Sequence, residues 1–174
     1  MIKLVLPSEK FLKSYQEAYD ENANNNVTTY CFNDPRTCDV LAKYERYRNE
    51  IDLPSNRVGQ TTYWLIDDEK DYFIGEIGIR HKLNDALLKI GGHIGYGISY
   101  SEWNKGYGTR MLAMALEIAK EMGLSRVLIT CNDDNIASAR VMEKNGLVLE
   151  DKILVYSEDE QKEVLIRRYW KTLL

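Results

Sequence analysis

Two glycines in the middle of the chain stand where a strand would turn into a helix. Residues 103–109 read Trp-Asn-Lys-Gly-Tyr-Gly-Thr, with Gly106 and Gly108 two positions apart. Glycine has no Cβ, so the backbone here can turn sharply and approach a ligand closely. The N–H groups in the first turn of a helix lack helical partners and lie at its positive dipole end. A glycine turn that leads into such a helix is suited to binding a phosphate group.

The flanking residues predict the strand and the helix that this site needs. Residues 93–100 alternate small or polar side chains with apolar ones, which is the period-two pattern of a strand. After the glycines, apolar residues recur at helical spacing and predict a helix buried on most of its circumference: Met111, Leu112, Ala115, Leu116, Ile118, Ala119 and Met122. The glycine spacing alone also fits an ordinary strand-to-helix turn. It matches neither a Walker loop nor the dinucleotide-binding Gly-x-Gly-x-x-Gly pattern.

Length and composition limit the class of protein. The chain has 174 residues, of which 44% are hydrophobic and 29% charged, and we expect a single domain over residues 1–174. The formal net charge of −4 argues against a nucleic-acid partner held through its phosphates. No apolar stretch approaches the roughly 18 residues that would span a membrane, and the N-terminus lacks a signal-peptide pattern. Three cysteines without metal-ligand spacing predict a cytoplasmic location and no metal.

The remaining pattern alternates strands and helices. Strands are predicted at residues 2–6, 61–67, 72–80, 87–100, 126–131, 147–156 and 163–170. Helices are predicted after Pro7, after Pro35, after the glycine turn and after Asp133-Asp134. This order predicts an α/β (α+β) fold with a central mixed, mostly antiparallel sheet of six to seven strands, flanked by about four helices. One parallel β-α-β unit is expected over residues 94–130, and its strand ends at the glycine turn, where such folds bind ligands.

Three segments resemble the GNAT (Gcn5-related) N-acetyltransferases. Residues 103–109 look like the family's Arg/Gln-x-x-Gly-x-Gly/Ala pyrophosphate loop, and residues 135–147 look like its Asn-x-x-Ser/Ala…Lys-x-Gly-Phe helix. Residues 74–77, Ile-Gly-Glu-Ile, resemble the Val-Gly-x-Ile signature of its third strand. The resemblance implies an N-acetyltransferase that uses acetyl-CoA as cosubstrate and transfers the acetyl group directly to an amine of a small molecule, peptide or protein.

Three residues depart from the family pattern. Trp103 replaces the commoner Arg or Gln, where the contact is largely through backbone, and Leu147 replaces a core Phe. Met142 stands where many members carry a Tyr that protonates the departing thiolate, so the general acid is unassigned. This departure keeps open an alternative, a non-catalytic acyl-CoA-binding or regulatory module of the same fold. An unrelated phosphate-binding α/β protein is a second alternative.

The resemblance also implies a set of cofactor-binding residues. Backbone groups of the loop would hold the pyrophosphate: Trp103, Lys105, Gly106, Tyr107, Gly108 and Thr109. N–H groups around Ile98, Ser99 and Tyr100 would polarise the acetyl carbonyl and bind pantetheine. Asn135 and Ser138 share a helix face and would meet the pantetheine amide and the sulfur, although Asn135 equally suits a helix cap. Arg140 and Lys144 would reach the nucleotide phosphates or lie in solvent.

Glu76, His93 and Ser138 are the expected catalytic residues. Glu76 would act as the base if burial raises its pKa toward neutrality, whereas His93 titrates in that range without such help. A water relayed from backbone carbonyls is the third candidate for the base, and Ser138 is a candidate acid. The expected partner is an amine acceptor, selected by the N-terminal helices, residues 22–34 and the final hairpin. Neither nucleic acid nor membrane is expected as a partner, and a homodimer is the assembly that the resemblance favours.

Overall fold

The computed structural model describes residues 1–27, 31–158 and 160–174 of the chain. Its strands are β1 (Ile2–Val5), β2 (Gln60–Asp67), β3 (Tyr72–Arg80), β4 (Ile94–Ile98), β5 (Arg126–Asn132), β6 (Val148–Ser157) and β7 (Lys162–Thr172). Its helices are α1 (Leu12–Asn24), α2 (Val40–Arg48), α3 (Asp85–Lys89), α4 (Tyr107–Glu121) and α5 (Ile136–Lys144), with 3-10 turns at Glu9–Phe11 and Tyr100–Glu102. The mixed α/β class predicted from the sequence is confirmed.

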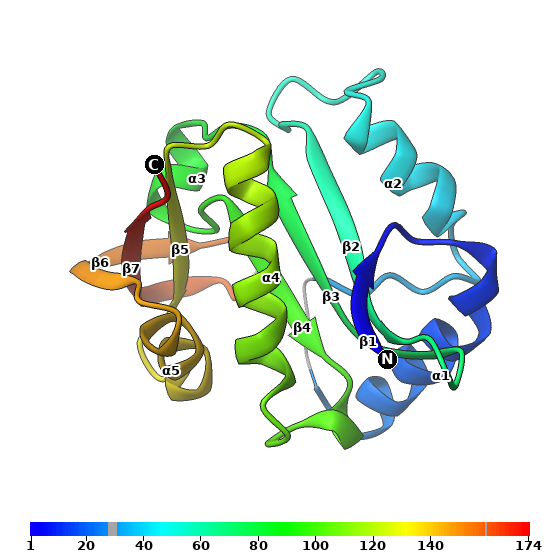
Figure 1. The fold of residues 1–174 in the computed structure, drawn as a ribbon. Helices are drawn as coiled ribbons and strands as arrows, with labels where there is room; N and C mark the ends of the chain where they lie inside the picture. The colour runs from blue at the N-terminus through cyan, green and yellow to red at the C-terminus, as the bar shows by residue number, and fades with distance from the viewer. Residues whose placement is uncertain (28–30, 159) are drawn as a thin grey trace.

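The strands form two antiparallel sheets rather than one mixed sheet. The first has the order β1-β2-β3-β4, and the second has the order β5-β7-β6. An isolated antiparallel bridge between Gly92 and Ile129 joins them. Beyond this bridge β4 and β5 diverge (Figure 1), and the expected parallel ladder between them is absent from the described residues. The side of β4 that faces away from β3 therefore has no strand partner among these residues.

The segment before β4 also differs from the prediction of a strand beginning at residue 87. Residues Asp85–Lys89 form the short helix α3 instead. Asn84 caps this helix, because its side-chain oxygen accepts the N–H of Leu87 at 2.9 Å. The chain then turns through Gly92, which has a φ of 62°. A Cβ on Gly92 would overlap the carbonyl of Leu128, so only glycine lets the two sheets approach so closely here.

Two apolar clusters hold the helices on opposite faces of the first sheet. One packs the buried face of α4, including Met111, against side chains of both sheets such as Ile77 and Ile129. The other lies between the first sheet and helices α1 and α2, where the fully buried rings of Tyr15 and Trp64 stack with centroids 4.6 Å apart. Because both faces of β3 are covered, a polar side chain between its two end residues is buried whichever way it points.

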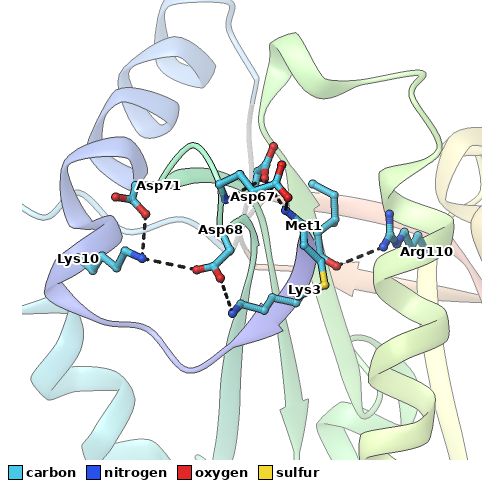
Figure 2. Close-up of polar contacts among 9 residues, drawn as sticks. Met1, Lys3, Lys10, Asp67, Asp68, Asp71 and Arg110 are labelled. Carbon is cyan, nitrogen blue, oxygen red and sulfur yellow. Dashed lines mark hydrogen bonds and ion pairs between the residues drawn. The ribbon is translucent and has the colours of Figure 1, made fainter.

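Polar contacts fasten the N-terminal strand beside the start of α4 (Figure 2). Lys3 on β1 pairs with Asp68, just after β2, at 2.7 Å. The guanidinium of Arg110, in the first turn of α4, donates to the carbonyl of Ile2 at 3.2 Å. The first of these pairs is too exposed to contribute much stability. The Arg110 contact helps to place the start of α4, because it bonds a basic side chain of its first turn to the backbone of β1.

Candidate active site

The glycine turn lies where the sequence predicts it, at the start of α4. Gly106 is the N-cap of α4 and has a φ of 80°, in the left-handed region that favours glycine. A Cβ built on Gly106 would find open space within 4 Å. No side chain caps α4, so the first-turn N–H groups of Tyr107, Gly108 and Thr109 lack a capping partner. This exposed positive helix end has the geometry of an anion cradle.

Side chains of the loop itself are held by short contacts. The indole Nε1 of Trp103 donates to the carbonyl of Ile98 at 2.9 Å. The ammonium of Lys105 pairs with Glu102 at 3.1 Å. Both side chains thus bind back onto the end of β4 and its 3-10 turn. The arrangement supports a loop that presents backbone, rather than side chains, to a ligand.

The backbone of Tyr96 and Ile98 forms the open edge of β4. The hydrogen-bond pattern between β4 and β3 shows why these two residues face outward. His93 accepts the N–H of Arg80 at 2.7 Å, and Ser99 donates its N–H to Ile74 at 2.9 Å. Antiparallel pairing uses alternate residues, so odd-numbered residues of this segment face β3 and even-numbered ones face away. The sequence had suggested N–H donors at residues 98–100. The Ser99 N–H is bonded to β3 and is not a free donor. The outward N–H groups of this strand are therefore those of Ile98, which the sequence suggested, and Tyr96, which it did not.

Tyr100 is engaged in another way. Its N–H donates to the side-chain oxygen of Asn22 on α1 at 2.9 Å. The Tyr100 side chain is exposed and lies against Trp103, with ring centroids 5.0 Å apart. The backbone of Tyr100 therefore joins β4 to α1 and is not available as a free donor in this state.

Helix α5 carries a second set of predicted residues, one of which contacts a side chain of β4. Asn135 is the N-cap of α5, and its side-chain oxygen accepts the N–H of Ser138 at 3.1 Å. The hydroxyl of Ser138 lies 2.9 Å from the phenol oxygen of Tyr96. Met142, one helical turn further along, is fully buried in the core. The structure therefore brings Ser138 to Tyr96 of β4, whereas the Met142 side chain is packed in the core.

Glu76 lies on the α1 and α2 side of β3, inside an aromatic cluster, and is only 3% exposed. Its Oε2 accepts the phenol O–H of Tyr44 at 2.6 Å and the indole N–H of Trp64 at 2.8 Å. Burial raises the pKa of Glu76 to about 8, although these two hydrogen bonds act in the opposite direction. The pKa shift expected from the sequence is present, and it brings the carboxyl into the range of a general base.

His93 lies where the two sheets join. Its Nδ1 accepts the backbone N–H of Leu128 at 2.9 Å, so the proton of the neutral ring is on Nε2. Burial lowers the pKa of His93 to about 4, and the nearby positive charges of Arg80 and Arg126 act in the same direction. The one basic nitrogen of His93 is thus occupied by the structure, which favours a role in joining the sheets.

The two candidate bases are not brought together. Glu76 is paired with Gly97 on β4, whereas His93 precedes this strand. Four residues of strand correspond to roughly 13 Å. Of these two candidate bases, only Glu76 lies on β3 opposite the β4 residues that form the open edge.

The basic residues of α5 take a different position. Arg140 and Lys144 are exposed, and no ion pair of either is found in the part of the chain that the structure describes. Their helix packs beside the start of α4, because Asn145 donates to the carbonyl of Thr109 at 3.1 Å. Both predicted roles, contact with nucleotide phosphates or solvation, stay open for these two side chains.

The fold adds Tyr96, Tyr44 and Asn22 to the predicted site residues. Tyr96 could have been found from the strand alternation, since it shares the orientation of Ile98. Nothing in the local sequence indicates that Tyr44 meets Glu76 or that Asn22 meets Tyr100. Residues 28–30 and 159, within the segments expected to select the acceptor, lie outside the described residues.

Among the described residues, no group of three or more His, Cys, Asp or Glu side chains is placed to hold a metal ion. Within the same residues, every helix is too short or too polar to cross a bilayer.

Comparison with known proteins assigns the family. The family model described as the acetyltransferase (GNAT) domain matches residues 12–148. The uncharacterized N-acetyltransferase YnaD of Bacillus subtilis (strain 168) is 29% identical over 146 residues, which cover 83% of this chain and 79% of YnaD. The microcin C7 self-immunity acetyltransferase MccE, solved with acetyl-CoA and AMP, has a TM-score of 0.75 at 16% identity and covers 98% of this chain and 92% of its own. An acetyltransferase from Salmonella typhimurium that modifies the N-terminal serine of ribosomal protein L7/L12 has a TM-score of 0.73 at 15% identity. The match covers 98% of this chain and 94% of that one. The chain therefore belongs to the GNAT acetyltransferase family.

Proposed function

We propose that this protein is an acetyl-CoA-dependent N-acetyltransferase that transfers the acetyl group directly to an amine. The observation that carries the proposal is the uncapped N-terminus of α4, entered through left-handed Gly106 and set beside the open edge of β4. A Cβ on Gly106 would find open space within 4 Å, and residues 103–109 resemble the family's pyrophosphate loop apart from Trp103. MccE, of the same fold, was solved with acetyl-CoA, which supports this choice of cosubstrate.

Each part of the reaction has a proposed group in this chain. Acetyl-CoA supplies an activated acyl thioester. The loop N–H groups from Gly106 to Thr109 hold the pyrophosphate. The outward N–H groups of Tyr96 and Ile98 bind along the open edge of β4 and polarise the thioester carbonyl. Preorganised donors of this kind are typically worth about 3–4 kcal/mol each in the transition state.

Glu76 is the proposed base for the acceptor ammonium. Its partner on β4 is Gly97, between the two residues of the open edge, so the backbone of Glu76 is one strand away from the proposed acetyl position. Its raised pKa suits proton transfer near neutral pH. His93 is the weaker candidate, because its basic nitrogen already accepts a backbone hydrogen bond. A relayed water is the remaining alternative.

The acceptor is proposed at the level of an amine on a small molecule, peptide or protein. The Salmonella typhimurium neighbour modifies a protein N-terminal serine, which favours including peptide N-termini. The test is release of free coenzyme A thiol from acetyl-CoA with a panel of aminoglycosides, polyamines, amino acids and peptides. The proposal predicts amine-dependent release with at least one class and a product heavier by one acetyl group.

The alternative, a non-catalytic acyl-CoA-binding module, is favoured by one observation. Met142 occupies the position of the family's acid and is fully buried, so no proton donor stands there. Tight coenzyme A binding without turnover over the whole panel would support this alternative. Binding of ATP or NAD in preference to coenzyme A would instead support an unrelated phosphate-binding protein. Amine-dependent thiol release excludes both.

A further inference from the structure

The phenol of Tyr96, whose backbone belongs to the open edge of β4, meets the hydroxyl of Ser138 on α5. The Tyr96 oxygen lies 2.9 Å from Ser138 Oγ and 3.3 Å from the Ser138 carbonyl oxygen. The same serine has its N–H held by Asn135 at 3.1 Å. Ser138 is therefore fixed at its backbone by the cap of α5 and at its side chain by β4, although 42 residues separate it from Tyr96.

The hydrogens in this pair can be arranged in two ways, because either oxygen can donate. A phenol and a hydroxyl each carry one hydrogen. When Tyr96 donates to Ser138 Oγ, the closer of its two acceptors, the serine hydrogen is free to point elsewhere. Burial raises the pKa of Tyr96 above its ordinary value, so the phenol stays protonated and able to donate.

A sulfur atom is already a neighbour of this hydroxyl. Burial raises the pKa of the Cys131 thiol to about 11, and a hydrogen bond from Ser138 acts in the opposite direction. The Cys131 thiol is thus a second neighbour of the Ser138 hydroxyl, besides Tyr96. No phenol on α5 can take this role, since Met142 occupies the family's position and its side chain is fully buried.

We infer that Tyr96 is a positioning residue, whose phenol donates to Ser138 Oγ and so directs the serine hydrogen toward the sulfur of the departing thiolate. The inference rests on the proposed function. As the amine nitrogen bonds to the acetyl carbon, the C–S bond breaks and its electron pair stays on sulfur. The Ser138 hydrogen bond stabilises that charge. The amine proton goes to the base, and the thiolate takes its proton from solvent after it leaves.

A double-mutant cycle tests this inference with Tyr96→Phe, Ser138→Ala and the double variant. We expect each single change to lower kcat about tenfold, with the KM for acetyl-CoA changed less than about threefold. The double variant should be no slower than Ser138→Ala alone, because Tyr96 acts through the serine. The inference would be overturned if the two single losses in kcat multiplied in the double variant, or if kcat were unchanged in Tyr96→Phe.

Tyr169→Phe is the matched control. It removes a phenol that also bonds to α5, through Glu143 at 2.9 Å, but lies away from Ser138. A merely structural effect of losing a phenol contact to α5 would lower kcat in this variant too. We expect its kcat to be unchanged.

A second readout does not require turnover. The ultraviolet absorbance of the thiolate of bound coenzyme A gives the pKa of its thiol. We expect this pKa to be lowered in the wild-type complex and to return toward its free value in both Tyr96→Phe and Ser138→Ala. If no amine is acetylated but this pattern appears, the inference stands while the proposed activity fails. A bound thiol that titrates alike in wild type and both variants, or no coenzyme A binding at all, overturns the inference.

Discussion

Replacing Glu76 by Gln should change how the stability of the protein depends on pH. Gln keeps the shape of the side chain and an oxygen that can accept from Tyr44 and Trp64, but it cannot ionise. Below the ordinary pKa of 4.5 the carboxyl is protonated in both the folded and the unfolded chain. Between 4.5 and about 8 the unfolded chain loses the proton while the folded chain keeps it, so the wild-type free energy of unfolding falls as pH rises. Above about 8 the difference becomes constant.

The size of this effect follows from the pKa shift. One pKa unit corresponds to about 1.4 kcal/mol, so a rise from 4.5 to about 8 corresponds to about 5 kcal/mol over the full window. By pH 7 the wild type should have lost about 3 kcal/mol relative to Glu76→Gln. This loss is roughly a fifth to three-fifths of the 5–15 kcal/mol by which domains are usually stable.

Urea denaturation of both proteins at intervals from pH 4.5 to pH 8.5 would measure this difference. We expect the two stabilities to be close at the acidic end and to separate steadily toward pH 8. Glu143→Gln is the control, because Glu143 also accepts a tyrosine O–H but is exposed, and its substitution should leave the wild-type profile unchanged. Parallel profiles for wild type and Glu76→Gln would refute the argument that desolvation governs this carboxyl.

Four further outcomes are expected. Glu76→Gln should lower kcat/KM by about 10²-fold and remove the acidic limb of the pH–rate profile, and an unchanged limb would move the role of base to a relayed water. Gly108→Val should weaken acetyl-CoA binding at least tenfold by calorimetry, and unchanged affinity would reject the loop assignment. The variant should stay folded, because a Cβ at position 108 would meet the Val141 side chain at 3.4 Å, an ordinary contact distance. His93→Ala should lower the free energy of unfolding by about 1–3 kcal/mol through the lost Leu128 contact, with kcat retained in the folded fraction; a selective loss of kcat would restore His93 as a base. Met142→Tyr should destabilise the core by about 1–3 kcal/mol without raising kcat, whereas a faster enzyme would show that an acid on α5 is limiting.

The sequence predicts best those elements whose pattern is local. The apolar spacing after Gly108 predicts α4, and Gly123, with a φ of 87°, follows its C-cap Met122. Leu87, Leu88 and Ile90 fit either a short strand or a helix, so α3 was missed although its Asn84 cap is visible in the sequence. The separation into two sheets could not be predicted. It depends on which distant strands pair and on the close approach of Gly92 to Leu128.

The site divides in the same way. The loop at residues 103–109 and the Asn135 cap are local motifs, and the structure has both the glycine turn and the cap. The surroundings of Glu76 come from Tyr44, 32 residues away, and those of Ser138 come from Tyr96, 42 residues away. Such contacts are set by how α2 packs on β2 and how α5 lies against β4, which no short motif encodes.

The position of Glu76 links the stability of this protein to its proposed chemistry. Desolvation raises its pKa to about 8, and the same desolvation makes its ionised form costly to hold in the fold. The fraction of Glu76 able to accept a proton therefore grows over the pH range in which the folded state becomes less stable. A small polar residue in place of Tyr15, which packs in the same cluster without bonding to Glu76, would hydrate the carboxyl, so it should lower the pKa of Glu76 and relieve this cost. It would also leave a weaker base at pH 7, because a carboxylate of ordinary pKa holds a proton poorly. The buried aromatic cluster on α1 and α2 thus sets the basicity of Glu76 at the expense of stability above pH 7.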